Sequence, residues 1–200
     1  MVGFGAGDWQ RGVDSERYKP ENRSNVLRAQ LLGNRPDRTL IGYIGRLAHE
    51  KRLEDLIDLD SQDDVQLVIV GDGPIRNRLE RKLPNAIFTG FKSGSDLAQM
   101  YASLDIFIHT GQHETFCQSI QEALASGVPV IAPNSGGPLD LVKHGWTGYL
   151  IDTSDSQELN HAVNLILRSP ELLTMSKRAR ESVIHRTWEG VNSQLIGHYS

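Results

Sequence analysis

The sequence has little cysteine, no excess of positive charge and no long apolar run. Its single cysteine, Cys117, excludes an internal disulfide and any metal site built from paired cysteines. Lys and Arg number 21 against 25 Asp and Glu, a net charge of −4, so no overall positive field is available to hold a nucleic-acid backbone. No apolar run is long enough to span a membrane, and no signal-like leader opens the chain. We therefore expect a reducing, cytoplasmic compartment and no nucleic-acid partner.

The chain has 200 residues, 38% of them hydrophobic, which is enough for one globular domain that buries roughly 70% of its unfolded surface. Six short runs are rich in β-branched and apolar residues and predict strands. Most are nearly continuous rather than alternating, which is typical of strands covered on both faces, as in a parallel sheet. The runs begin at Thr39 (TLIGYIG), Val65 (VQLVIVG), Ala86 (AIF), Leu104 (LDIFIH), Val128 (VPVIA) and Gly148 (GYLI).

Helical patterns alternate with these runs, and the alternation predicts an α/β fold with a Rossmann-like, doubly wound parallel sheet. The segment before Thr39 is rich in Gly, Arg and Asn with little periodicity, so we expect loop or linker there rather than core. The predicted helices lie near residues 53–61, 74–82, 95–103, 117–126, 138–143, 156–168, 170–185 and 188–199. The last of them would place Trp188, Val191, Leu195 and Tyr199 on one face.

Ligands of such sheets bind at the carboxyl ends of the strands, which here means the loops after Gly45, Gly71, His109 and Ala132. In the first of these loops, Arg46 and Lys51 flank a turn that leads into a helix. An Arg fork, a mobile Lys charge and a helix amino terminus together suit an anion such as phosphate. The alternative is that both residues are solvated surface cations, which contribute ~0 to 1 kcal/mol each.

The richest segment runs HTGQHETFCQSIQEALASGVPVIA from His109 and places Glu114 and Glu122 around a strand-to-helix junction. Glu114 lies at the loop and Glu122 about two turns into the helix. A carboxylate at the helix start, with the free amides of residues 115–117, can bind sugar hydroxyls, and Glu122 can clamp a vicinal diol such as a ribose. The alternative is that Glu114 caps the helix and Glu122 faces water.

Other signals are weaker. Gly136 and Gly137 precede Pro138, and their exposed amides would suit a phosphate, although an ordinary tight turn before a helix explains them equally. Asp72, in the turn GDGP, is as readily structural as ligand-binding. His109 and His144 show no spacing pattern and are interpreted as structural or surface residues.

Several competing signatures are missing. No second histidine follows the His113 and Glu114 pair at the zincin spacing, and no Walker phosphate loop follows any strand. The glycines of residues 3–7 precede the first predicted strand instead of following it, which disfavours a dinucleotide-dependent oxidoreductase. We therefore expect no metal and no cofactor.

Taken together, five motifs occur in a specific order along the chain and resemble the retaining GT-B glycosyltransferases of the large "group 1" family. They are GVD at Gly12, YIGRLAHEK at Tyr43, VIVGDGP at Val68, IFTGF at Ile87, and HETFCQSIQEALASGVPVIAPNSGGPLDLV at His113. The resemblance implies the carboxy-terminal, donor-binding half of a GT-B fold, in residues 39–200, after a linker or hinge in residues 1–38. It also implies that the amino-terminal acceptor domain is absent. Details of the motifs look most like actinobacterial GDP-mannose-dependent α-mannosyltransferases.

The resemblance also implies roles for individual residues. Arg46 and Lys51, after Gly45, match the pair that holds the donor diphosphate and stabilises it as it leaves. Glu114 matches the first glutamate of the Glu-x₇-Glu motif, near the donor hexose, and Glu122 matches the second, on the ribose. The remaining implied donor contacts are the amides of Thr115, Phe116 and Cys117, the residues Phe91 and Lys92 near the base after Gly90, and the loop of Gly136 and Gly137. Cys117 departs from the pattern, which has glycine there, and its side chain limits how closely a sugar approaches the backbone.

The implied reaction is metal-independent hexosyl transfer with retention, from a nucleotide sugar such as GDP-mannose to a glycolipid or glycan acceptor. We expect the isolated chain to be inactive, to self-associate through the face that begins at Trp188, and to reach the inner membrane surface only through its missing half. A non-catalytic nucleotide-sugar-binding module is the alternative.

Overall fold

The computed structural model describes residues 12–112 and 117–186, which form a six-stranded sheet between two layers of helices. All five strand pairs are parallel, in the order β3-β2-β1-β4-β5-β6. The strand order reverses between β1 and β4, as in other doubly wound sheets. This confirms the predicted fold class and all six predicted strands. The strands are β1 (Thr39–Ile44), β2 (Val65–Val70), β3 (Ile87–Gly90), β4 (Ile106–Ile108), β5 (Val130–Pro133) and β6 (Gly148–Ile151).

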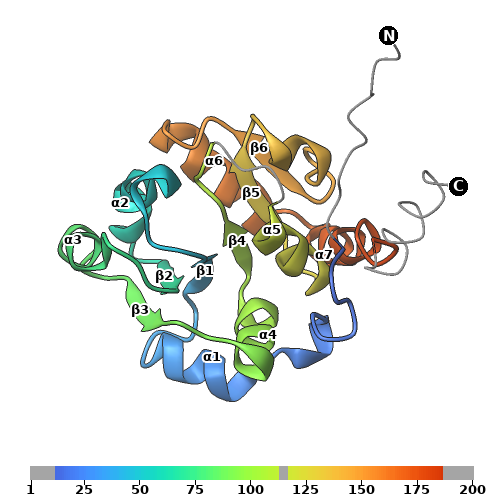
Figure 1. The fold of residues 1–200 in the computed structure, drawn as a ribbon, viewed down its shortest axis with the longest axis horizontal. Coiled ribbons are helices and arrows are strands. Elements are labelled where there is room, and N and C mark those ends of the chain that lie inside the picture. Colours follow the sequence, from blue (N-terminus) through green and yellow to red (C-terminus); the bar gives the residue numbers. More distant parts are fainter. Residues whose placement is uncertain (1–11, 113–116, 187–200) are drawn as a thin grey trace, which may run out of the picture.

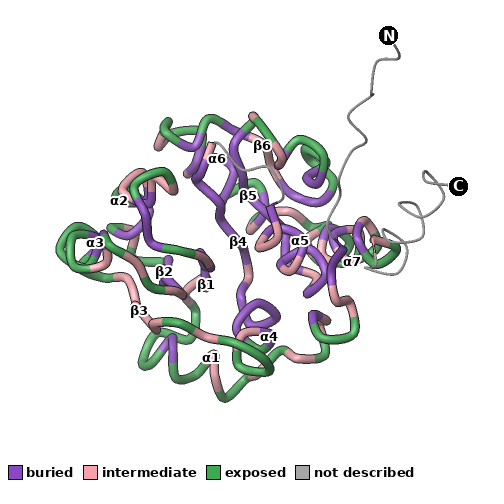
Figure 2. Tube along the Cα trace, in the orientation of Figure 1, coloured by how far each residue is buried: buried purple, intermediate pink, exposed green. Residues whose placement is uncertain are grey.

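The central strands are buried on both faces, as their continuous apolar runs predict. In β1, Leu40 and Ile44 pack into one hydrophobic cluster, whereas Ile41 and Tyr43 pack into the other. Figure 2 shows this burial along β4 and β5, with the exposed residues on the outer helices and loops. The sheet therefore separates two cores, and side chains that alternate along each strand contribute to both.

The helices divide between the two faces, as Figure 1 shows. One core lies between the sheet and helices α1, α4, α5 and α7, and the other lies between the sheet and helices α2, α3 and α6. The helices are α1 (Asn25–Leu32), α2 (Ile57–Asp60), α3 (Arg76–Lys82), α4 (Gly94–Ser103), α5 (Gln118–Ala125), α6 (Ser156–Leu167) and α7 (Leu172–Glu181). Short 3₁₀ helices are η1 (Pro20–Asn22), η2 (His49–Lys51), η3 (Leu53–Leu56) and η4 (Gly137–Asp140).

Two predicted helices are shorter or tighter than the sequence patterns indicate. The pattern at residues 53–61 is a 3₁₀ turn, η3, followed by the four-residue α2. The pattern at residues 138–143 is only the 3₁₀ helix η4. Pro138 lies in its first turn as predicted, but a proline at this position suits either helix type, so it does not distinguish them.

The expectation of loop before Thr39 is wrong for residues 25–32, which form helix α1. Ser24 caps this helix by accepting a hydrogen bond from the Leu27 backbone amide, and Leu31 and Leu32 are buried. Val13 and Tyr18, farther toward the amino terminus, also join the core. The assignment of residues 1–38 as a hinge between domains stays a prediction.

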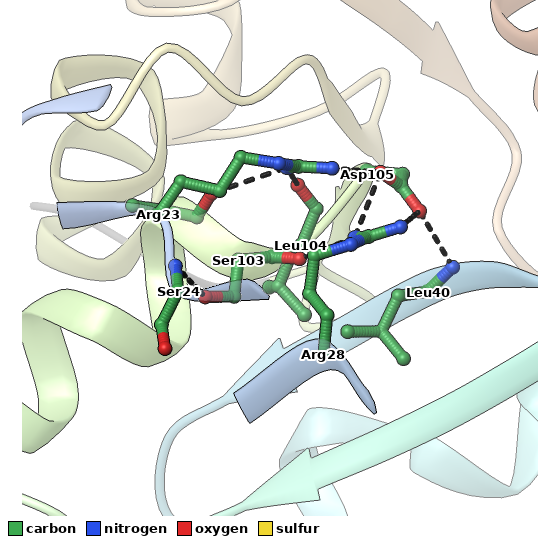
Figure 3. A network of polar contacts seen from close by, with 8 residues as sticks. Arg23, Ser24, Arg28, Leu40, Ser103, Leu104 and Asp105 are labelled. Atoms are coloured by element: carbon green, nitrogen blue, oxygen red, sulfur yellow. Dashed lines mark hydrogen bonds and ion pairs between the residues drawn. The ribbon is translucent and has the colours of Figure 1, made fainter. Parts of the chain in front are cut away.

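A network of hydrogen bonds and ion pairs connects this amino-terminal segment to the sheet (Figure 3). The Asp105 carboxylate, directly before β4, accepts hydrogen bonds from the guanidinium groups of Arg23 and Arg28 at 2.8 to 3.0 Å and from the Leu40 backbone amide at 2.9 Å. The Arg28 guanidinium also donates to the Ser103 carbonyl. A single carboxylate thus joins the start of the chain, strand β1 and the α4–β4 connection.

Some predictions fall beyond the described residues. The helix expected at residues 188–199, and the apolar face through which we expect self-association, lie in that part of the chain. Within the described ranges, none of the helices combines the length and hydrophobicity that a membrane span requires.

Candidate functional site

A cavity of about 470 Å³ opens at the carboxyl edge of the sheet, where the strand order reverses. This is the place at which open α/β sheets bind their ligands. Residues at the ends of β1, β2 and β4 line one side, and residues of α4 and α5 line the other. The lining residues are Tyr43, Ile44, Gly45, Arg46, Lys51, Val70, Gly71, Asp72, Phe91, Lys92, Leu97, Tyr101, His109, Gln118, Ser119 and Glu122.

Arg46 and Lys51 both face this cavity. Arg46 is exposed, and its carbonyl accepts a hydrogen bond of 3.0 Å from the buried Tyr43 hydroxyl. The Lys51 carbonyl accepts a hydrogen bond from the Thr110 hydroxyl, which joins η2 to the loop after β4. Side chains of β1 and of the loop after β4 therefore fix the backbone of both cations, and two positive charges lie at one edge of the cavity.

Gly71 allows the loops after β1 and β2 to meet behind these cations. Its φ is 132°, and a Cβ built there would lie 1.9 Å from the Gly45 carbonyl oxygen. Any side chain would therefore both strain the backbone and collide with the β1 loop. The Gly45 amide donates to the Val70 carbonyl, and the Leu47 amide donates to the Asp72 carbonyl. These contacts hold the backbones of the two loops close together at the cavity.

Glu122, on α5, lines the opposite side with Tyr18, Tyr101 and Gln118 as polar neighbours. Burial raises the pKa of the Glu122 carboxyl, although the Tyr101, Gln118 and Tyr18 side chains partly offset this by favouring the ionised form. Burial also raises the pKa of the Tyr18 hydroxyl to about 12, with a further contribution from the Glu122 charge. Glu122 is therefore partly buried among polar side chains rather than fully exposed to water, as the simpler of the two sequence interpretations has it.

Phe91 and Lys92 line the rim of the cavity, directly after β3. The Phe91 ring is 76% exposed, which is unusual for a large apolar side chain and leaves its face available for stacking. Gly90, at the end of β3, has φ of 72° and turns the chain outward at this point. A planar ligand group at the rim would find an aromatic surface and a cation beside it.

Cys117 is buried at the start of α5 in a left-handed conformation, with φ of 45° and ψ of 44°. A non-glycine residue is uncommon there because its Cβ crowds the backbone. Burial raises the pKa of the thiol to about 12, so the side chain is neutral. Cys117 does not contribute to the cavity lining.

The structure does not bring Gly136 and Gly137 to the cavity. Gly136, with φ of 64°, precedes η4 at the carboxyl end of β5, and neither glycine is among the lining residues. Glu114, Thr115 and Phe116 lie outside the described residues, so their assignment to the donor sugar stays a prediction. Of the predicted set, Gly45, Arg46, Lys51, Phe91, Lys92 and Glu122 share the cavity.

Sequence reasoning did not assign Tyr43, Tyr101 or His109 to the site. Tyr43 and Tyr101 occur within an apolar strand run and a helical pattern, where they are typical core residues. His109 carried a usable signal, because it directly follows a strand at the edge where ligands bind. Among the described residues, no group of three or more His, Cys, Asp and Glu side chains is arranged to hold a metal ion.

Two curated relatives are similar to nearly the whole chain. The GDP-mannose-dependent alpha-mannosyltransferase of Corynebacterium glutamicum is 48% identical over 193 residues, which is 96% of this chain and 46% of the relative. The protein of the same description from Mycolicibacterium smegmatis is 49% identical, over 96% of this chain and 50% of the relative. The chain thus spans about half the length of these relatives.

Among solved structures, Anabaena Alr3699/HepE in complex with UDP and glucose is similar with a TM-score of 0.81 and 29% identity, covering 94% of this chain and 55% of that one. The fold is that of the carboxy-terminal, Rossmann-like half of GT-B glycosyltransferases. The family model described as "Glycosyl transferases group 1" matches residues 28–182. The chain belongs to this family of glycosyl transferases.

Proposed function

We propose that this chain is the donor-binding half of a retaining hexosyltransferase that transfers mannose from GDP-mannose to a glycolipid or glycan acceptor. One observation carries the proposal: Arg46, Lys51 and Glu122 line the same cavity at the point where the strand order reverses. The identity of 48–49% to GDP-mannose-dependent mannosyltransferases supports the choice of base and sugar.

Arg46 and Lys51 would bind the donor diphosphate. As the glycosidic bond breaks, negative charge grows on the departing phosphate oxygen, and the attraction to both cations increases. Because their backbone is already fixed by Tyr43 and Thr110, little reorganisation is needed during the reaction. This electrostatic stabilisation replaces the role of a metal ion in the proposed reaction.

Glu122 would accept hydrogen bonds from the two ribose hydroxyls, as a carboxylate with two acceptor oxygens can do. The base would then extend toward the rim, where Phe91 offers a stacking surface. Glu114 and the amides of Thr115, Phe116 and Cys117 are assigned to the hexose. The proposed loop of Gly136 and Gly137 would have to approach the donor from outside the cavity lining.

The acceptor and the exclusion of water are assigned to a second half that is not part of this chain. We place the reaction in the cytoplasm, where the other half would contact the inner membrane surface.

A non-catalytic nucleotide-sugar-binding module would use the same cavity. The two functions make different predictions for the chain when it is joined to an acceptor-binding half. The transferase would then transfer sugar, whereas the binding module would not.

The diphosphate contact is tested by calorimetric titration of the Arg46→Ala and Lys51→Ala variants with GDP and with guanosine. We expect GDP binding to weaken by ~1.5 to 3 kcal/mol in each variant, because each loses charge-assisted hydrogen bonds. Guanosine binding should change little.

The exposed cations Arg81 and Lys177, which do not line the cavity, provide matched alanine controls. These controls should bind GDP as the unaltered chain does. Equal losses for GDP and guanosine in the Arg46 and Lys51 variants would contradict the assignment. Tighter binding of UDP or ADP than of GDP would contradict the choice of base.

A further inference from the structure

His109 occupies the inner part of the cavity. It follows β4, and its backbone amide donates to the Ile131 carbonyl at 2.9 Å, so the sheet fixes its position. Its side chain is only 3% exposed, yet it lines the cavity. Of the structural and surface roles interpreted from the sequence, this burial excludes the surface role, and a structural or a binding role remains.

A structural role would require hydrogen-bond partners for the polar atoms of the ring. Within the described part of the chain, neither Nδ1 nor Nε2 makes a hydrogen bond of good geometry, although the Gly111 backbone lies close to the ring. The ring stacks on Tyr43, with centroids 6.5 Å apart and planes at 20°, but the Tyr43 hydroxyl donates to the Arg46 carbonyl instead. Buried polar atoms without partners are costly and rare, so a functional role is one explanation to consider for them.

The imidazole is neutral at physiological pH. Burial, and then the positive charge of Lys51 on η2, lower its pKa to about 4, against a weaker opposite effect of the Gly111 backbone. Strand β1 also packs on the ring and presents Tyr43, whose own pKa is raised by burial. A neutral imidazole has one nitrogen that donates a hydrogen bond and one that accepts.

Gly111 keeps the space beside the ring open. A Cβ built at this position would lie 3.3 Å from His109 Nε2 and 3.4 Å from Lys51 Cδ. Nε2 and the Lys51 stem therefore border the same small volume, which a side chain at residue 111 would fill. If Lys51 binds the donor diphosphate, the group beside Nε2 is one that is attached to this diphosphate. Since Glu122 is assigned to the ribose, the group left for Nε2 is the hexose.

We infer that His109 binds the donor hexose, with its neutral imidazole exchanging a hydrogen bond with a sugar hydroxyl beside the Lys51 position. A hydroxyl both donates and accepts, as the imidazole does, whereas an ionised phosphate oxygen only accepts and would leave one nitrogen without a partner. This inference rests on the proposed donor site and adds a sugar-binding residue to it.

The test is a nuclear magnetic resonance titration of the full chain and its His109→Phe variant with GDP-mannose and with GDP. We expect the variant to lose about tenfold in affinity for GDP-mannose, since a buried hydrogen bond is lost, and less than about twofold for GDP. In the unaltered chain, the His109 ring nitrogen shifts should move on addition of GDP-mannose and stay in place with GDP.

Two further variants serve as controls. His109→Gln keeps one donor and one acceptor, so it should recover part of the lost affinity, and it tests the inference if the Phe variant fails to fold. His161→Phe removes an exposed histidine on α6 and should bind as the unaltered chain does. Equal losses for GDP and GDP-mannose, or no loss, would overturn the role of His109. Failure of the unaltered chain to bind GDP would instead overturn the proposed donor site.

Discussion

Within the described part of the chain, His109 is buried in the cavity without the hydrogen-bond partners that a purely structural role would give it. Neither Nδ1 nor Nε2 of its ring makes a hydrogen bond of good geometry there. Each such group lowers stability, because its hydration is lost on folding and nothing replaces it. At this position, the cavity therefore lowers the stability of the folded chain.

The contribution of His109 to the free energy of unfolding depends on pH. Its pKa is about 4 in the folded chain against 6.5 unfolded, so the folded state binds fewer protons between these values. The titration of His109 therefore leaves the free energy of unfolding unchanged above pH 6.5 and lowers it as the pH drops toward 4. Because His109→Gln removes this titration, the unaltered chain should lose about 2 to 3 kcal/mol more than the variant between pH 7.5 and 4.5. Urea unfolding at both pH values measures this difference, and parallel losses would contradict it.

Glu122 is expected to select ribose. Glu122→Gln replaces one of two acceptor oxygens with an amide that donates, so only one ribose hydroxyl keeps its acceptor. The preference for GDP over 2′-deoxy-GDP should fall by about fivefold, as expected for one hydrogen bond. Titration of both nucleotides into both proteins measures the preference, with Glu16→Gln as an exposed control. An unchanged preference would remove Glu122 from the ribose.

The sequence predicts Arg46 and Lys51 as site residues because they follow a clear apolar run, and it predicts Glu122 from its spacing from Glu114. The structure brings the three to one cavity, and their roles stay predictions. Tyr43 and His109 are different, because their contact depends on the pairing of β1 with β4, which are distant in sequence. No local pattern contains that information.

Among the structural elements, the strands follow directly from the sequence, but helix α1 does not. The strand runs are continuous because both faces are buried, which is a strong compositional signal. Helix α1 buries only Leu31 and Leu32, so its apolar periodicity is weak. Arg28 of this helix and Arg23 before it instead donate hydrogen bonds to the Asp105 carboxylate, which is distant in sequence. Such bonds leave no periodic pattern in the sequence.

Asp105 is expected to be the most sensitive polar residue of this attachment. Its side chain is 20% exposed and accepts from Arg23, Arg28 and the Leu40 amide (Figure 3). Asp105→Ala leaves these partly buried donors without an acceptor and should lower the free energy of unfolding by about 2 to 4 kcal/mol.

Urea unfolding measures the loss at Asp105, and Glu16→Ala is the control. Glu16 is 90% exposed and pairs with Lys19 at 4.0 Å, so its removal should have little effect on the free energy of unfolding. A loss at Asp105 no larger than at Glu16 would show that the network does not hold the amino-terminal segment.

For the whole molecule, we expect these 200 residues to bind donor weakly and to transfer no sugar on their own. They offer one wall of a site, and the chain spans about half the length of its curated relatives. Orientation of two substrates can contribute ~7 to 11 kcal/mol to catalysis, and we propose that a second, acceptor-binding half supplies the orientation of the acceptor. Incubation with radiolabelled GDP-mannose and a membrane lipid extract tests this. Lipid labelling that is lost in Arg46→Ala would show a complete transferase.

We propose above all that the cavity between the ends of β1, β2 and β4 and helices α4 and α5 binds a nucleotide sugar. The most direct measurement is residue-resolved mapping of backbone amide shifts during titration of the full chain with GDP-mannose. We expect no shifts at Arg28 or Asp105, and we expect saturable shifts at the cavity residues Gly45, Arg46, Lys51, Phe91, Lys92, His109 and Glu122. Shifts confined to another surface, or no saturable shifts at all, would contradict this proposal.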